Sequence, residues 1–180
     1  MSLNNLGISL LLQGRAAEAR QQLEEAIALQ RQIGDRWSLA NALNNLGNVA
    51  RQQQQLGQAR KLYTESLLIN KELGDKWSIA YLLEDVAHLA LLEAQYAHSV
   101  TLLIFAHDLR KEIGAPPPPS EAETRQQLLT EAKQELDATE IDKATSAGQS
   151  LSVDEALSYA LEVTTKKSSQ RYPATGPGIP

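Results

Sequence analysis

Apolar and small residues return along this chain at a fixed interval of 40 positions. Within each block they recur three, four and seven residues apart, which is the periodicity of one face of an α-helix. The large residues at matched positions are Leu6, Leu46 and Val86, then Leu23, Tyr63 and Leu103, then Leu29, Ile69 and Leu109. A repeat of this length predicts stacked helical units, each of which leaves a hydrophobic face that its neighbours cover.

Each repeat is predicted to form two antiparallel helices, helix A and helix B, joined by a short turn. The predicted ranges are 37–52 and 77–92 for helix A, and 15–33, 56–73 and 96–113 for helix B. Gly34, Gly74 and Gly114 follow the B helices, where glycine readily takes the left-handed conformation that ends a helix. Asp35 and Asp75 then stand at the N-cap of the next helix A.

Small residues also recur at matched positions on both helices of the hairpin. They are Gly7, Gly47 and Ala87 on helix A, and Ala19, Ala59 and Ser99 on helix B. Packed helices lie about 8–10 Å apart, and small residues on the facing sides allow the closest approach. We therefore expect these positions to mark the contact between the two helices of each hairpin.

This order of residues resembles the tetratricopeptide repeat. The match covers residues 3–114 and places Gly14, Ala19, Leu23 and Ala26 in the order of that family. The period of 40 residues is longer than the usual 34, and similar long repeats occur in LGN/Pins-type adaptors, MalT-like bacterial regulators and Rap-type phosphatase regulators. The resemblance implies an all-α, right-handed superhelix of antiparallel hairpins whose A helices line a concave groove.

The region after the repeats begins with four consecutive prolines, which cannot continue a helix because they lack backbone N–H groups. Helices are expected at about 121–137 and 138–147, the second stopped by Gly148, and a last helix follows near the C-terminus. Two capping boxes are predicted, Ser120 with Glu123 and Ser152 with Glu155.

The resulting division of the chain has a truncated first repeat and a capped C-terminal end. The expected parts are three repeats in 1–114 (1–34, 35–74 and 75–114), a proline-rich break at 115–120, capping helices at 121–163 and a disordered tail at 164–180. The C-terminal part contains IGAPPPPSEAE at 113–123, then a helix and a glycine, then LSVDEALSYAL at 151–161. This arrangement is similar to the C-terminal end of bacterial regulators of the LuxR, AfsR and STAND-ATPase types.

The first helix is more than a turn shorter than its copies, because only Met1 and Ser2 precede the first repeat leucine. A solenoid with an uncovered apolar end is expected to associate with something. We hypothesise that the chain is the C-terminal arm or a fragment of a larger bacterial signalling or transcriptional regulator, or that it self-associates through the truncated helix. A frayed but tolerated first helix is the alternative.

Composition and charge narrow the possible partners. The 180 residues are 42% hydrophobic, contain no cysteine and carry a net charge of −5. Residues 115–163 hold 10 acidic and 3 basic side chains, a net charge of −7. This balance disfavours nucleic acid as a direct ligand, and no stretch is long and apolar enough for a membrane span. We expect a cytoplasmic protein with a protein or peptide partner.

A polar stripe on the exposed face of the A helices is the candidate binding surface. It consists of Asn4 in the first unit, Asn41, Asn44, Asn48 and Arg51 in the second, and Tyr81, Glu84 and His88 in the third. An asparagine side chain both donates and accepts hydrogen bonds, which suits the backbone of an extended peptide. An ordinary solvated helix face is the alternative. The basic positions of the family's carboxylate clamp fall on Asn4, Tyr81 and Asp85, which disfavours a C-terminal carboxylate as ligand.

Other kinds of site have little support in the sequence. His88, His98 and His107 lie on different helices or faces, so no metal site is expected. Trp37 and Trp77 share a repeat position and are expected to pack at the joint between hairpins. No glycine-rich phosphate loop is present. We therefore expect no cofactor, no metal and no enzymatic activity.

Two classes of function follow from this sequence. The favoured one is an interaction scaffold that binds a peptide or a helical segment in its concave groove. The other is a sensor arm for a sugar or metabolite, which the resemblance to MalT-like regulators implies. Sugar recognition usually needs aromatic surfaces beside polar groups, and Tyr81 is the only aromatic residue expected in the groove. The sequence therefore favours a polypeptide ligand.

Overall fold

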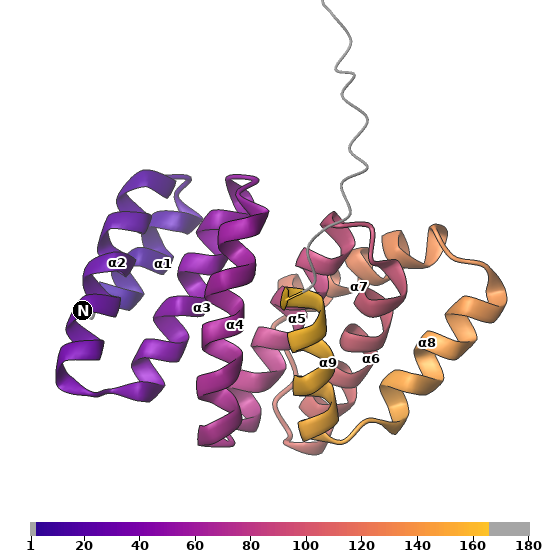
Figure 1. The fold of residues 1–180 in the computed structure, drawn as a ribbon. Coiled ribbons are helices and arrows are strands. Elements are labelled where there is room, and N and C mark those ends of the chain that lie inside the picture. The colour runs from indigo at the N-terminus through magenta and orange to yellow at the C-terminus, as the bar shows by residue number, and fades with distance from the viewer. Residues whose placement is uncertain (1–2, 166–180) are drawn as a thin grey trace, which may run out of the picture.

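The computed structural model describes residues 3–165, which form nine α-helices (Figure 1). The helices are α1 (Leu3–Leu12), α2 (Ala16–Ile33), α3 (Arg36–Gln52), α4 (Leu56–Leu73), α5 (Lys76–Leu92), α6 (Tyr96–Glu112), α7 (Pro119–Gln134), α8 (Ala138–Ser150) and α9 (Val153–Thr165). The first six pack as the antiparallel pairs α1–α2, α3–α4 and α5–α6, side by side along one axis. The predicted all-α fold of stacked hairpins is confirmed. No helix in this part of the chain is long and apolar enough to span a bilayer.

Local signals place the ends of the repeat helices within a residue or two of the predicted positions. Gly34 and Gly74 adopt the left-handed conformation directly after α2 and α4, with φ angles of 75° and 65°. Asp35 accepts a hydrogen bond from the backbone N–H of Ser38 at 3.0 Å, and Asp75 accepts one from Trp77 at 3.0 Å. Both aspartates therefore cap the following A helix, as predicted.

The small residues of helix A mark its closest approach to helix B. A Cβ atom added at Gly7 would lie 2.6 Å from the Leu23 side chain, and one added at Gly47 would lie 2.5 Å from the Tyr63 ring. Ala19 and Ala59 on the B helices are fully buried. Glycine at these positions of helix A thus makes room for a large residue of helix B, and the sequence-based expectation is confirmed.

Helix α7 continues the row of A helices beyond the proline break. It packs against α5 and α6, just as α5 packs against α3 and α4. The predicted capping box at Ser120 and Glu123 is wrong, because the helix begins two residues earlier than predicted, at Pro119, with Pro118 at the N-cap. Proline suits the first helical position, since its fixed φ angle is already helical and its missing N–H would have no helical partner.

Helix α8 lies on the outer side of α6. The sequence predicted that Gly148 would stop this helix. That prediction is wrong, because the helix runs on to Ser150. A Cβ atom added at Gly148 would lie 2.6 Å from the backbone oxygen of Thr101, so this glycine serves the close packing of α8 on α6. The helix begins with a capping box that the sequence analysis missed, formed by Asp137 and Glu140.

Helix α9 folds back onto the B-helix side of the molecule. It packs against α4, α5 and α6, and in Figure 1 it lies in front of α5. The predicted capping box is confirmed, since the backbone N–H of Ser152 donates to Glu155 at 2.8 Å and that of Glu155 donates to the Ser152 hydroxyl at 3.3 Å. Its residues in the main hydrophobic core are Ala156, Leu157, Ala160 and Val163.

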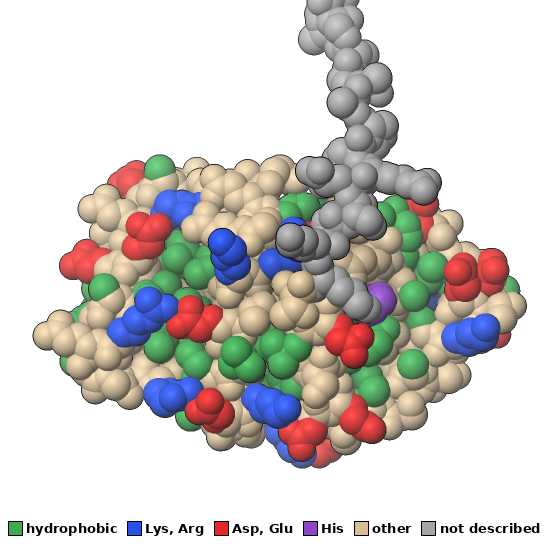
Figure 2. Space-filling model, in the orientation of Figure 1, with side chains coloured by type: hydrophobic (Ala, Val, Ile, Leu, Met, Phe, Trp, Pro, Cys, Tyr) green, Lys and Arg blue, Asp and Glu red, His purple; other side chains and the backbone are tan. Residues whose placement is uncertain are grey.

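The predicted tail at 164–180 lies outside the described residues, apart from Thr164 and Thr165, which form the end of α9. On the visible part of the B-helix side, acidic and basic side chains are scattered among apolar ones (Figure 2). The B-helix side therefore shows no dominant charge in this view. At the other end of the molecule, α1 and α2 expose Leu12, Leu29 and Ile33.

Candidate functional site

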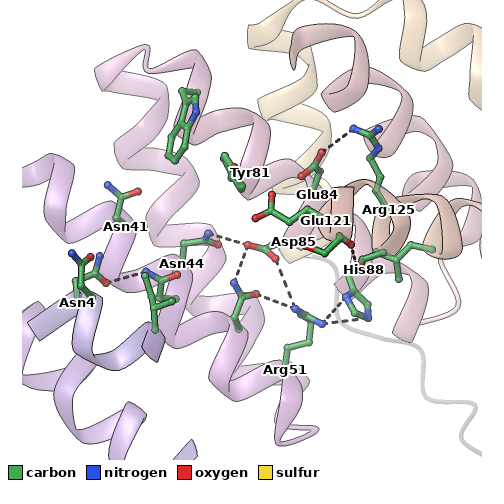
Figure 3. A pocket seen from close by; sticks show the side chains of 18 of the residues that line it. Asn4, Asn41, Asn44, Arg51, Tyr81, Glu84, Asp85, His88, Glu121 and Arg125 are labelled. Carbon is green, nitrogen blue, oxygen red and sulfur yellow. Dashed lines mark hydrogen bonds and ion pairs between the residues drawn. The ribbon is translucent and has the colours of Figure 1, made fainter. Parts of the chain in front are cut away.

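A groove with a volume of about 840 Å³ runs along the A helices (Figure 3). Side chains from α1, α3, α5 and α7 line it, so it crosses all three hairpins and the helix that follows them. All eight residues of the predicted stripe lie along this groove: Asn4, Asn41, Asn44, Asn48, Arg51, Tyr81, Glu84 and His88. The helical register predicted from the sequence thus brings these side chains to one surface.

A polar network centred on Asp85 forms part of the groove floor. Asn44 and Asn48 each donate a side-chain hydrogen bond to Oδ2 of Asp85, at 2.9 and 3.0 Å. Arg51 places a guanidinium nitrogen 3.8 Å from the other carboxylate oxygen. Because neighbouring A helices pack side by side, α5 supplies the partner for three side chains of α3. The expectation that Asn44 and Asn48 are exposed is therefore wrong; both are half-buried and engaged.

The Arg51 side chain extends the network in two further directions. Its Nη1 lies 2.6 Å from Nδ1 of His88, and its Nε donates to the hydroxyl of Tyr63 at 3.2 Å. The Tyr63 hydroxyl in turn donates to Oδ1 of Asn48 at 2.7 Å, and the Tyr63 side chain is fully buried. Residues of α3, α4 and α5 are thus tied together beneath the groove, and their positions are fixed before any ligand arrives.

Burial and neighbouring charges shift the pKa values of two groups in this network. Burial raises the pKa of Asp85, although the Arg51 charge and the two asparagine amides oppose the shift. Burial together with the Arg51 charge lowers the pKa of His88 to about 4. At neutral pH His88 is therefore neutral, and its Nδ1 accepts the hydrogen bond from Arg51.

A second network holds Tyr81 and Glu84. The side chain of Arg110, which is 1% exposed, donates two hydrogen bonds to the Glu84 carboxylate, at 2.9 and 2.8 Å. Its guanidinium carbon lies 3.8 Å from the centre of the Tyr81 ring, a cation–π arrangement. Arg125 of α7 approaches Glu84 to 3.6 Å. Charge-assisted pairs of this kind fix both groove residues in place.

Two tryptophan rings lie along the groove as well. Trp37 and Trp77 line it and are 52% and 49% exposed. Nε1 of Trp37 donates to Asp75 at 2.8 Å, so Trp37 does bridge the joint between two hairpins, as expected. The ring of Trp77 lies 4.4 Å from that of Tyr81. Tyr81 is therefore not the only aromatic residue in the groove, which corrects the sequence-based expectation.

The remaining stripe residues differ in how they are engaged. Asn4 accepts a hydrogen bond from Asn45 at 2.9 Å, which joins α1 to α3. Asn41 is half-buried and makes no hydrogen bond to another described side chain or backbone group. Of the asparagines in the predicted stripe, Asn41 therefore keeps its donor and acceptor groups available within the described part of the chain.

Helix α7 contributes groove residues that the sequence analysis missed. Glu121, Thr124 and Leu128 line the groove. They stand 40 residues after Tyr81, Glu84 and His88, so the repeat interval continues across the prolines. Extending the register by one more period would have found them. The capping role expected for residues 121–163 stays a prediction, and α7 lines the groove in addition.

Comparison with known proteins supports the repeat assignment for part of the chain. A tetratricopeptide repeat family model matches residues 1–72. Such repeats are generally protein–protein interaction modules. No curated protein matches the sequence.

Proposed function

We propose that this chain is an interaction scaffold that binds a peptide or a helical segment of a partner protein in the groove of its A helices. We further propose that it is the arm of a larger bacterial signalling or transcriptional regulator, in line with the resemblance of its C-terminal part. The observation that carries the first proposal is the continuous groove of about 840 Å³, lined from α1 to α7 by side chains that internal networks hold in place.

The shape of the groove favours a polypeptide ligand. Four neighbouring A helices with axes about 8–10 Å apart give a length of roughly 25–30 Å. An extended chain rises about 3.3–3.6 Å per residue, so about eight residues would fill this length. Side chains fixed in advance reduce the entropy lost on binding, which is one source of affinity. A rigid, elongated groove therefore suits a segment of a protein chain.

A sensor arm for a small ligand, such as a sugar or a metabolite, is the second candidate. The exposed rings of Trp37 and Trp77 favour it, because aromatic faces beside amide groups suit sugar recognition. The two functions differ in the part of the groove they use. A small ligand would contact one or two helices, whereas a peptide would contact α1 through α7.

Blocking the groove tests the proposal directly. Asn41→Arg places a long side chain in the groove without breaking a hydrogen bond between described residues. Gln21→Arg introduces the same arginine side chain on α2, at an exposed position that does not line the groove. Partners captured from the native cell should be retained by the wild type and by Q21R and lost by N41R. Equal capture by all three proteins would show that the groove is not the binding surface.

A further inference from the structure

The groove has two unlike parts along the direction of its helices. Toward the C-terminal ends of the A helices, the side chains around Asp85 bond mainly to one another, as Asn48 and Arg51 show. Toward the N-terminal ends lies a surface that we call the tryptophan end, made of Trp37, Asn41, Trp77, Tyr81 and Glu121. Here two indole rings are half exposed, and the Asn41 amide has no hydrogen bond to another described residue.

We propose that the tryptophan end binds a basic, proline-rich segment of a separate partner polypeptide, in the polyproline II conformation, with prolines three residues apart. This inference rests on the proposed function of the groove and specifies its ligand. It draws on the spacing of the rings, the hydrogen-bonding groups beside them and the charge around them.

The spacing of the two tryptophans matches the pitch of polyproline II. Trp37 and Trp77 occupy the same register on α3 and α5, which pack against each other. Packed helices lie about 8–10 Å apart. A polyproline II helix has three residues per turn and rises about 3.1 Å per residue, so residues i and i+3 are separated by about 9.3 Å on one face. One proline ring can therefore lie on each indole.

The hydrogen-bonding groups at this end suit a ligand that is rich in acceptors. Trp37 already uses its N–H on Asp75, so it offers an apolar ring face. Trp77 Nε1 and the Asn41 amide have no partner among residues 3–165 and can donate to main-chain carbonyls. Polyproline II leaves its carbonyls unbonded, and proline has no N–H to satisfy. A β-type extended peptide would instead present N–H groups for which this helical wall offers no strand edge.

Charge around the tryptophan end favours a basic ligand. Asp35, Asp75 and Glu121 have no cationic partner within 4 Å in the described part of the chain. The neighbouring cations Arg36 and Lys76 are each paired with a glutamate at the end of the following helix, Glu72 of α4 and Glu112 of α6. Indole faces also attract guanidinium and ammonium groups. A lysine or arginine beside the prolines would therefore meet both carboxylates and aromatic rings.

Intrinsic fluorescence reports on this surface, because the chain contains two tryptophans and both lie there. The full chain is titrated with three synthetic peptides of identical composition (proline, alanine and lysine) in which prolines are spaced two, three or four residues apart. We expect the three-residue spacing to shift the emission and to bind at least about tenfold more tightly than the others. Asn41→Ala should weaken its binding severalfold, Glu121→Lys should weaken it and reduce its salt dependence, and Gln21→Ala should leave it unchanged.

Several results would overturn the inference. Equal affinity at every proline spacing, or equal binding of a lysine–alanine peptide, would show that the rings do not read polyproline II. The chain's own C-terminal residues also contain prolines and basic side chains. Binding that is seen only after Pro173, Pro177 and Pro180 are replaced by alanine would mean that this segment, and not a separate partner, occupies the groove.

The failure of this inference is distinguishable from failure of the proposed function. If no peptide binds while partner capture remains sensitive to Asn41→Arg, the groove binds a polypeptide of another chemistry. If capture is insensitive to Asn41→Arg, the proposed function itself fails.

Discussion

Replacing Gly148 by alanine should separate the packing role of this residue from a helix-stopping role. The added Cβ atom would meet the backbone oxygen of Thr101 at 2.6 Å and Cβ of Ile104 at 2.9 Å. A backbone atom cannot rotate away, so α8 must move off α6. Overpacking of this kind costs about 1–3 kcal/mol, and the gain in helix propensity from Gly to Ala offsets about 1 kcal/mol of it. We expect G148A to lower the free energy of unfolding by about 0–2 kcal/mol.

Gly57 supplies the matched control on another helix. It lies in the first turn of α4, its φ angle is not positive, and nothing lies within 4 Å of an added Cβ atom. Gly57→Ala should therefore raise the free energy of unfolding by about 0.5–1 kcal/mol. The free energies of unfolding of the two variants should thus differ by about 0.5–3 kcal/mol.

Urea and thermal unfolding followed by circular dichroism measure this difference. For a chain of this size, 1 kcal/mol corresponds to a change of about 2–4 °C in Tm. A G148A variant that is stabilised as much as G57A would refute the reasoning, because α8 and α6 would then not be in the close contact described above.

Two further predictions concern the networks beneath the groove. The lowered pKa of His88, about 4, means that the fold favours its neutral form, so its contribution to stability is complete above about pH 6.5 and is lost as the pH falls toward 4. His88→Asn should therefore reduce the loss of stability between pH 6.5 and 4.5 relative to wild type. Asp85, whose raised pKa acts in the opposite direction, is present in both proteins and does not account for the difference. Parallel stability–pH profiles of the two proteins would contradict the lowered pKa of His88. Glu84→Ala removes both Glu84 hydrogen bonds from the buried Arg110 guanidinium and should lower the free energy of unfolding by about 3 kcal/mol. Glu121→Ala, at an exposed position, should change the free energy of unfolding by less than about 0.5 kcal/mol. Equal effects of the two substitutions in urea denaturation would show that the Glu84–Arg110 pair does not stabilise the fold.

The repeat helices could be predicted from the sequence because their signals are local. Gly34 and Gly74 end a helix through their own φ angles, and Asp35 and Asp75 cap the next one through backbone groups two or three residues away. Such signals can be read without knowing what packs against the helix. Gly148 could not be interpreted in this way, because its packing role depends on the backbone oxygen of Thr101, 47 positions earlier in the chain.

The state of the groove side chains could be predicted only in part. The 40-residue register placed the eight stripe residues on one surface. It did not reveal that Asn44 and Asn48 would each donate a hydrogen bond to Asp85, which lies on the next repeat. Nor did it show that α7 continues the groove, because four consecutive prolines interrupt the helical pattern before α7. Contacts between repeats decide these features, and composition and periodicity within one repeat do not report them.

Site-specific photocrosslinking tests the central claim, that the groove of the A helices holds a partner polypeptide, most directly. A photoreactive residue is placed at position 41 on α3 or at position 21 on α2, and each protein is mixed with a captured partner. If the groove holds the partner, crosslinks form from position 41 and none form from position 21. Binding of the partner with crosslinks from position 21 alone would contradict it.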